Sequence, residues 1–210
     1  ADAFSKYGTY DVYKIDTGIQ SSSRSCGLLA CDTHEGYENN TPDMSGLLST
    51  IEADVLVVVS GAGKVSGITL KVLKQLVTKL GTEKVSVLYV KPDMEELSGE
   101  IEMQERLVFN VLQQYARSGM INNLILVSNP ELEKIVGDVP IRSYYEKLNE
   151  LLVSTIHMIN IFNHSEAEIK TNLRRSETSR ISTLGIYNFE ENEEKMFFPL
   201  DNRLEMHYYY

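Results

Sequence analysis

The chain has 210 residues, 42% of them apolar and 24% charged, which is ordinary for a globular protein. This length supplies one well-packed core and a small appendage, but not two full domains. A net charge of −10 and a pI near 4.9 argue against a nucleic-acid surface, which needs clustered lysines and arginines. The longest unbroken apolar run, residues 55–59, is far too short to cross a bilayer.

Cys26 and Cys31 are the only cysteines, and no second pair accompanies them. His34 could join Cys31 in a metal site, but nothing else in the sequence supports one, so no metal is expected. The chain does not open on a charged stretch followed by an apolar one, so we expect a cytoplasmic location and reduced thiols. The basic run at residues 170–175 is interpreted as a solvated helix face.

Hydrophobic patterning then predicts alternating elements along the chain. Strands are expected over residues 10–15, 54–59, 85–90 and 123–127. Helices are expected over residues 68–80, 100–117 and about 141–162. The 54–59 run is continuously apolar and β-branched, as in a parallel strand that is buried on both faces. The alternation predicts an α/β fold, with a mostly parallel sheet and helices on both faces.

The character of the chain changes after about residue 165. Residues 181–187 and 196–200 are expected to pair as a short hairpin across the acidic run at residues 189–194. We therefore divide the chain into a main domain over residues 1–169 and a short C-terminal β extension over residues 170–210. The terminal residues 207–210 (HYYY) fit a packed end, or an aromatic anchor for a neighbouring subunit.

A glycine-rich turn follows the second predicted strand. Its sequence, GAGKVSG over residues 61–67, matches neither the Walker loop nor the Rossmann pattern. Small residues between a buried strand and a helix let backbone N–H groups approach a phosphate. Alone, the turn is equally compatible with a tight strand-to-helix connection.

The stretch ADVLVVVSGAGKVSG resembles the segment of tubulin and FtsZ in which a strand enters a signature loop, GGGTGSG or GGGTGTG. Gly61, Gly63, Ser66 and Gly67 match that signature, whereas the three other loop residues depart from it. Further matches follow in the family's order. Residues 90–92 (VKP) with 98–100 (SGE), residues 126–129 (LVSN) and residues 143–152 (SYYEKLNELL) resemble its later motifs.

The resemblance covers residues 9 to about 169 and implies a tubulin/FtsZ-like domain that binds GTP or GDP, accompanied by magnesium. It implies that Asn129 contacts the nucleotide, that Tyr145 stacks on guanine and that Asn149 hydrogen-bonds the base edge. One helical turn separates Tyr145 from Asn149, so both lie on one helix face. The glycine-rich turn would then hold phosphate.

Three departures put hydrolysis in doubt. The family's first phosphate loop has no counterpart before residues 1–4, and the second is echoed only at residues 41–43, preceded by the acidic Glu35 and Glu38. The hydrolysis loop has its best counterpart at residues 163–168, where Ser165 replaces one carboxylate and Glu168 is the candidate catalytic residue. GTP hydrolysis is therefore expected to be weak or absent.

Two functions fit these observations. The first is a guanine-nucleotide-binding assembly protein that packs head-to-tail with itself, homologous subunits or other assembly proteins. The alternative is a degenerate tubulin-like structural module that binds no nucleotide and belongs to a permanent phage or cellular assembly. An unrelated doubly wound enzyme would need a catalytic dyad, which the sequence does not offer.

Overall fold

The computed structural model describes residues 1–137, 139–165, 179–187 and 197–199. Its centre is a four-stranded parallel sheet in the order β3-β4-β5-β6. These strands are Val55–Ser60, Val85–Lys91, Asn123–Ser128 and Ile181–Thr183. β4 and β5 lie inside the sheet and are almost wholly buried, as their β-branched and leucine-rich sequences require.

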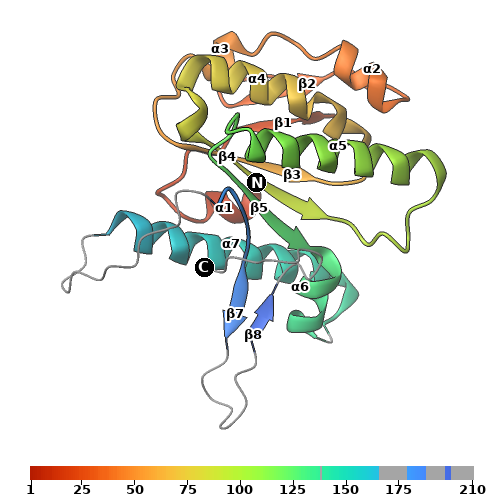
Figure 1. Cartoon of the computed structure of the whole chain (residues 1–210), viewed down its shortest axis with the longest axis vertical. Helices are drawn as coiled ribbons and strands as arrows, with labels where there is room; N and C mark the ends of the chain where they lie inside the picture. The colour runs from red at the N-terminus through yellow and green to blue at the C-terminus, as the bar shows by residue number, and fades with distance from the viewer. Residues whose placement is uncertain (138, 166–178, 188–196, 200–210) are drawn as a thin grey trace.

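Helices cover both faces of the sheet (Figure 1). α4 (Thr69–Leu80) and α5 (Gly99–Arg117) pack on one face, where Leu73 and Leu112 are fully buried. α6 (Asn129–Val136) and α7 (Tyr144–His164) pack on the other face, where Leu132 and Leu152 join a second apolar cluster. The sheet therefore separates two cores, as in other α/β layer proteins.

The first fifty residues form smaller elements. α1 (Asp2–Ser5) lies against α7, and its neighbour Tyr7 places its ring 3.9 Å from that of His157. β1 (Lys14–Thr17) and β2 (Ser25–Leu28) form a separate two-stranded parallel sheet, which packs on the α4 and α5 side. α2 (His34–Asn39) and α3 (Ser45–Leu48) follow, and Thr33 caps α2 by accepting a hydrogen bond from the Gly36 N–H.

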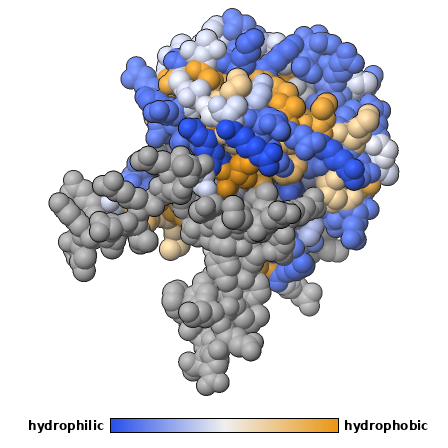
Figure 2. All heavy atoms as spheres, viewed as in Figure 1, coloured by the Kyte–Doolittle hydropathy of each residue, from blue (hydrophilic) through white to orange (hydrophobic). Residues whose placement is uncertain are grey.

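Short 3-10 turns precede three of these elements, at Lys64–Ile68, Thr82–Lys84 and Ile141–Ser143. Gly81 ends α4 with φ +88°, a conformation that favours glycine. The side of the molecule that carries α4 and α5 exposes hydrophobic patches among hydrophilic side chains (Figure 2). Among the described residues, no helix combines the length and apolarity needed to cross a membrane.

The predicted α/β fold with a parallel sheet is confirmed, and the strands expected at 54–59, 85–90 and 123–127 lie within one residue of their predicted bounds. The strand expected at residues 10–15 is displaced, because β1 begins only at Lys14. The expected C-terminal hairpin is present as the antiparallel pair β7 (Gly185–Tyr187) and β8 (Phe197–Pro199). β6, which was expected to belong to that hairpin, instead adds a parallel strand to the main sheet beside β5.

Candidate functional site

The three long strands of the sheet run in the same direction, so their carboxyl ends meet at one edge. Ser60, Lys91 and Ser128 end these strands, and the glycine-rich turn, the loop before α5 and the start of α6 continue from them. Open parallel sheets bind ligands at this edge, because the connecting loops leave room there for side chains to converge. Every described residue of the predicted site belongs to this edge or to the start of α7.

Gly61 holds the glycine-rich turn close to β4. Its N–H donates a hydrogen bond to the Val90 carbonyl at 2.9 Å. A Cβ at this position would lie 2.6 Å from Cδ of Pro92 and 3.0 Å from the Tyr89 hydroxyl, so only glycine fits without movement. The next residue, Ala62, has φ 62°, which is costly for a residue with a side chain. Gly61 therefore serves the tight connection between strand and turn.

The rest of the turn lies under α2. Residues 64–68 form a 3-10 helix, and a Cβ on Gly67 would lie only 2.3 Å from the His34 carbonyl oxygen. The Ser66 hydroxyl is 3.3 Å from Nε2 of His34. Gly67 is buried and Ser66 is half-buried, whereas Gly63 and Lys64 are exposed. Of the four predicted phosphate ligands, only Gly63 is therefore open to solvent in this conformation.

His34 contacts the glycine-rich turn, which the sequence did not reveal. Burial lowers the pKa of His34, although the nearby Glu38 carboxylate opposes part of that effect. The neutral imidazole is therefore favoured beside the Ser66 hydroxyl. Thr33 is a favoured residue for a helix N-cap and could have indicated the start of α2, but nothing in the sequence places α2 on the glycine-rich turn.

The base side of the predicted site is arranged differently. Asn129 opens α6 directly after β5, with Pro130 in the first turn, and it is half-buried. Tyr145 and Asn149 lie one turn apart near the start of α7, and both are exposed. The Tyr145 side chain is 73% exposed, and its one described ring contact is an edge-to-face packing against Tyr144. An exposed tyrosine with an exposed amide below it can receive a planar base.

Tyr144 ties the start of α7 to the neighbouring elements. A hydrogen bond between its hydroxyl and the Glu133 carboxylate of α6 is the main cause that raises the pKa of Tyr144 to about 12, and the Glu96 charge adds to this effect. Glu96 belongs to the loop between β4 and α5, so that loop, α6 and α7 converge here. Tyr144 thereby holds the helix start on which Tyr145 is displayed.

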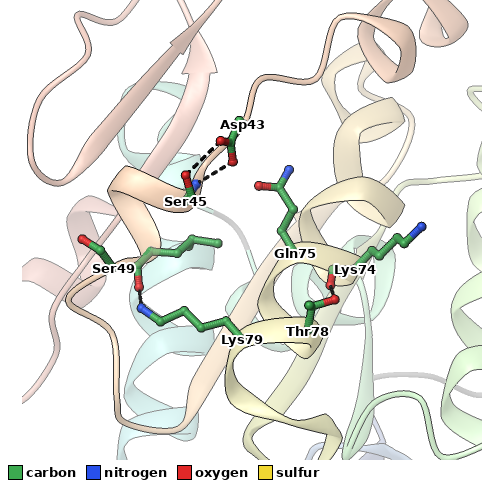
Figure 3. Close-up of a pocket in the computed structure, with 8 residues that line it drawn as sticks. Asp43, Ser45, Ser49, Lys74, Gln75, Thr78 and Lys79 are labelled. Carbon is green, nitrogen blue, oxygen red and sulfur yellow. Dashed lines mark hydrogen bonds between the residues drawn. The ribbon is translucent and has the colours of Figure 1, made fainter.

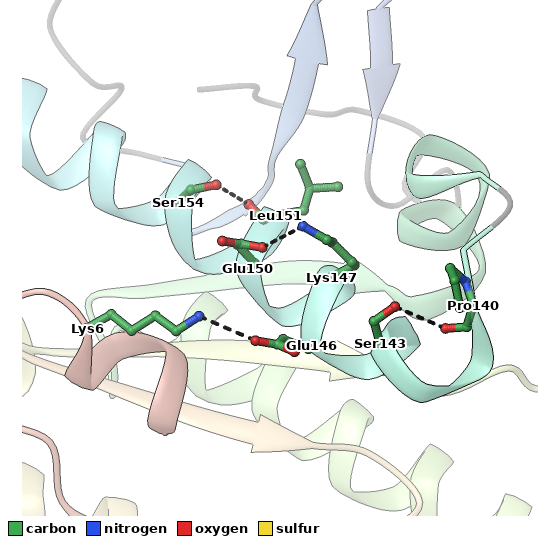
Figure 4. A network of polar contacts seen from close by, with 8 residues as sticks. All are labelled: Lys6, Pro140, Ser143, Glu146, Lys147, Glu150, Leu151 and Ser154. Carbon is green, nitrogen blue, oxygen red and sulfur yellow. Dashed lines mark hydrogen bonds and ion pairs between the residues drawn. The ribbon is translucent and has the colours of Figure 1, made fainter.

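Ion pairs fix the following turn of α7 (Figure 4). Glu146 pairs with Lys6 of the N-terminal segment at 3.8 Å, and Lys147 pairs with Glu150 at 3.2 Å within the helix. The Ser143 hydroxyl donates to the Pro140 carbonyl at 3.2 Å, just before the helix begins. Exposed pairs of this kind add little stability each.

A hollow of about 480 Å³ lies elsewhere, between α3 and α4 (Figure 3). Lys74, Gln75 and Lys79 of α4 line it on one side, and Asp43 and Ser45 on the other. Gln75 fastens the loop before α3, because it accepts a hydrogen bond from the Met44 N–H at 2.8 Å. The hollow does not contain any of the predicted nucleotide ligands.

The remaining candidates stay outside the site. No group of three or more histidine, cysteine or acidic side chains in the described part of the chain could hold a metal ion. Cys31 contacts the Leu29 carbonyl and the Asn40 amide, each at 3.6 Å. Glu168, the candidate catalytic residue, lies outside the described residues.

Comparison with known proteins points to one fold. No family model and no curated protein sequence matches the chain. Among solved structures, CetZ from Methanosaeta thermophila strain DSM 6194 matches with a TM-score of 0.55 and 15% identity over 76% of this chain. CetZ belongs to the tubulin/FtsZ superfamily. The protein has a distant tubulin-like fold. The match spans about half of CetZ, 47% of its length.

Proposed function

We propose that the protein is a tubulin-like assembly protein that binds GTP or GDP at the carboxyl edge of its sheet and associates with copies of itself. The observation that supports this proposal is that Asn129 opens α6, which packs against α7, while Tyr145 and Asn149 near the start of α7 are both exposed. The likeness to CetZ supports the fold on which such a site is built. The free thiols of Cys26 and Cys31 support a cytoplasmic location.

Nucleotide would enter with its base against Tyr145 and its phosphates toward Gly63. The exposed Lys64 beside Gly63 would add positive charge to the phosphates, and magnesium would bind through them. Gly61, Ser66 and Gly67 shape the turn rather than offer open ligands in the present conformation. A shift of α2 would be required before their backbone groups could reach a phosphate. Hydrolysis, for which Glu168 is the candidate residue, is proposed to be weak or absent.

The packing of α2 favours a second candidate function. Because His34 lies against both Gly67 and Ser66, the phosphate side of the edge is already filled by the protein itself. A tubulin-like module that serves only as a structural part of a permanent assembly would not need open space for a phosphate there. This candidate differs from the first in one measurable respect, the binding of guanine nucleotide.

The deciding experiment measures the melting temperature of the purified chain with GTP, GDP or ATP, each at millimolar concentration with magnesium. A ligand that binds only the folded state raises the melting temperature. We expect GTP and GDP to raise it more than ATP does. Asn149→Ala should abolish the preference for guanine nucleotides over ATP. Tyr145→Ala should weaken the binding of both GTP and GDP, and so reduce the shift in melting temperature that each causes.

Lys147→Gln is the matched control, since Lys147 lies between the two binding residues on α7 and forms an exposed ion pair. It should retain the full shift. Equal melting temperatures with and without GTP in the unmodified chain would reject the nucleotide site. The second candidate function, a structural module without nucleotide, would then be favoured. Nucleotide found after gentle purification, identified by its absorbance and chromatographic retention, would independently support the site.

A further inference from the structure

The charges of this protein are separated along the chain. Residues 55–82 contain four lysines and no acidic residue, although the whole chain carries a net charge of −10. These lysines, Lys64, Lys71, Lys74 and Lys79, lie on the 3-10 turn before α4 and on α4 itself. We call them the basic surface. Lys71 and Lys74 are one turn apart, so their ammonium groups emerge on the same helix face.

The basic surface is not neutralised within the protein. Six other cations, from Lys6 to Lys147, form ion pairs with described carboxylates. None of the four lysines of the basic surface forms an ion pair with a described residue. Lys79 donates to the Leu48 carbonyl beside the hollow between α3 and α4 (Figure 3), while the ammonium of Lys74 extends from the same helix.

An acidic segment of opposite charge follows β4. Residues 92–105 contain six acidic residues and no lysine or arginine. Glu105 is buried and Glu102 pairs with Arg106. The others lie in residues 93–100, where Glu95, Glu96 and Glu100 are exposed and form no ion pair with a described residue. We call residues 93–102 the acidic segment.

The partner of the basic surface can be inferred from charge complementarity. Nucleic acid is bound by clustered lysines and arginines that neutralise many phosphates, and the basic surface offers only four lysines. A second copy of this chain offers its acidic segment, which is opposite in sign to the basic surface. Each surface has three exposed charges: Lys64, Lys74 and Lys79 on one, and Glu95, Glu96 and Glu100 on the other. α4 and α5 pack on the same face of the sheet, and the acidic segment leads from β4 into the start of α5.

We propose that the basic surface on α4 binds the acidic segment of a second copy. The contact joins two different surfaces, so each copy can bind one neighbour with α4 and another with the loop before α5. This inference rests on the self-association part of the proposed function and is independent of nucleotide. Exposed pairs are individually weak and strongly screened, so association depends on several of them and falls steeply with salt.

The experiment is sedimentation velocity on the purified chain at low and high sodium chloride, over a range of protein concentrations. We expect concentration-dependent association at low salt and monomer at high salt. The double variant Lys71→Glu/Lys74→Glu and the double variant Glu95→Lys/Glu96→Lys should each be monomeric at low salt. A mixture of the two should associate again, because each then supplies a surface that complements the other.

Two further variants keep the result specific. Lys71→Gln/Lys74→Gln should weaken association without introducing repulsion, and it covers the case in which charge reversal impairs folding. Arg24→Glu/Lys134→Glu makes the same change in net charge as the lysine reversal, and it should associate like the unmodified chain. Both residues of this control form exposed ion pairs on other elements.

A chain that remains monomeric at low salt would overturn the proposal, as would association that survives high salt and the lysine reversal. Failure of the mixture to associate, with both variants folded by circular dichroism, would do the same. None of these results decides the nucleotide site, which the shift in melting temperature with GTP tests separately. A nucleotide-binding chain without salt-sensitive association would thus keep the site and reject this interface.

Discussion

At the scale of single residues, His34 links stability to pH. Burial lowers the pKa of His34 below that of an unfolded histidine, about 6.5. Between the lowered pKa and about pH 6.5, the unfolded chain therefore binds more protons than the folded one. The free energy of unfolding should fall as the pH is lowered through this window and recover as the pH rises again.

The measurement is urea denaturation between pH 7.5 and pH 5 for the unmodified chain and for His34→Gln. The glutamine can still reach the Ser66 hydroxyl but does not titrate. We expect a smaller loss of stability on acidification in His34→Gln than in the unmodified chain. Identical pH profiles would show that His34 does not contribute to the linkage.

Lys91 and Glu105 place opposite charges in the protein interior. Lys91 is fully buried, with its ammonium 4.3 Å from the centre of the Phe109 ring. The Tyr89 hydroxyl donates to the Glu105 carboxylate at 3.4 Å, and burial together with that charge raises the pKa of Tyr89. The four residues form one cluster between β4 and α5, and we expect the two opposite charges in this desolvated setting to stabilise each other.

Removing one of these charges should therefore lower the free energy of unfolding more than removing both. Glu105→Ala is expected to destabilise the fold by about 3–5 kcal/mol, because it leaves the Lys91 charge buried without its counterpart. The apolar pair Lys91→Met/Glu105→Leu should recover most of that loss. Chemical denaturation of Lys91→Met, Glu105→Leu and the double variant measures the coupling, and additive losses would contradict it.

The sequence could predict where the proposed base-binding residues lie in the fold. It could not predict that α2 packs on the glycine-rich turn, which is the proposed phosphate side. Asn129, Tyr145 and Asn149 follow a strand end and a helix start that periodicity reveals, so their position at the carboxyl edge was predictable. The packing of His34 on Gly67 was not, because it joins residues that are far apart in the chain through a helix of six residues. A glycine required for close packing looks the same in sequence as one required for a phosphate.

At the scale of secondary-structure elements, β3 is a sheet edge of unusual composition. The Gly61 N–H faces β4, so alternation along the strand directs the backbone groups of Leu56, Val58 and Ser60 to the outer edge. No described residue pairs with them there. Val58 is 49% exposed, and β3 carries no charge or proline that would discourage pairing with another strand.

Val58→Lys should therefore reduce aggregation. A lysine on an exposed edge position costs little stability and discourages edge-to-edge pairing. We expect less light scattering than from the unmodified chain during prolonged incubation at high ionic strength, where charge-driven association is screened. Val57→Lys is the contrasting variant, since Val57 packs against the main core, and it should destabilise the fold. Unchanged aggregation in folded Val58→Lys would show that this edge is protected.

Element prediction succeeded where periodicity was long. α5 and α7 extend over 19 and 21 residues, enough turns for an apolar stripe to be recognised. α2, α3 and β2 have six residues or fewer, and their sequences are too short to show a period. α6 was overlooked because Asn129-Pro130 is a typical turn signal, although proline is also favoured in the first turn of a helix.

At the scale of the whole molecule, one sheet carries two cores. The cluster under α4 and α5 contains Tyr89 and Leu126, while the cluster under α7 contains Leu88 and Val127, their neighbours on the same strands. Successive residues of β4 and β5 therefore point into opposite cores. Neither core can lose its strands without exposing the other, so the two should unfold together.

This coupling predicts a single transition for variants on either side of the sheet. Leu112→Ala in the first core and Leu152→Ala in the second should each lower the stability by about 2–5 kcal/mol, since both side chains are buried. Far-ultraviolet circular dichroism and tyrosine fluorescence should report coincident unfolding curves in both variants. A transition that separates into two steps in Leu152→Ala alone would show that the α7 layer opens before the sheet. The start of α7, with Tyr145 and Asn149, would then be able to move independently of the strand ends that complete the proposed site.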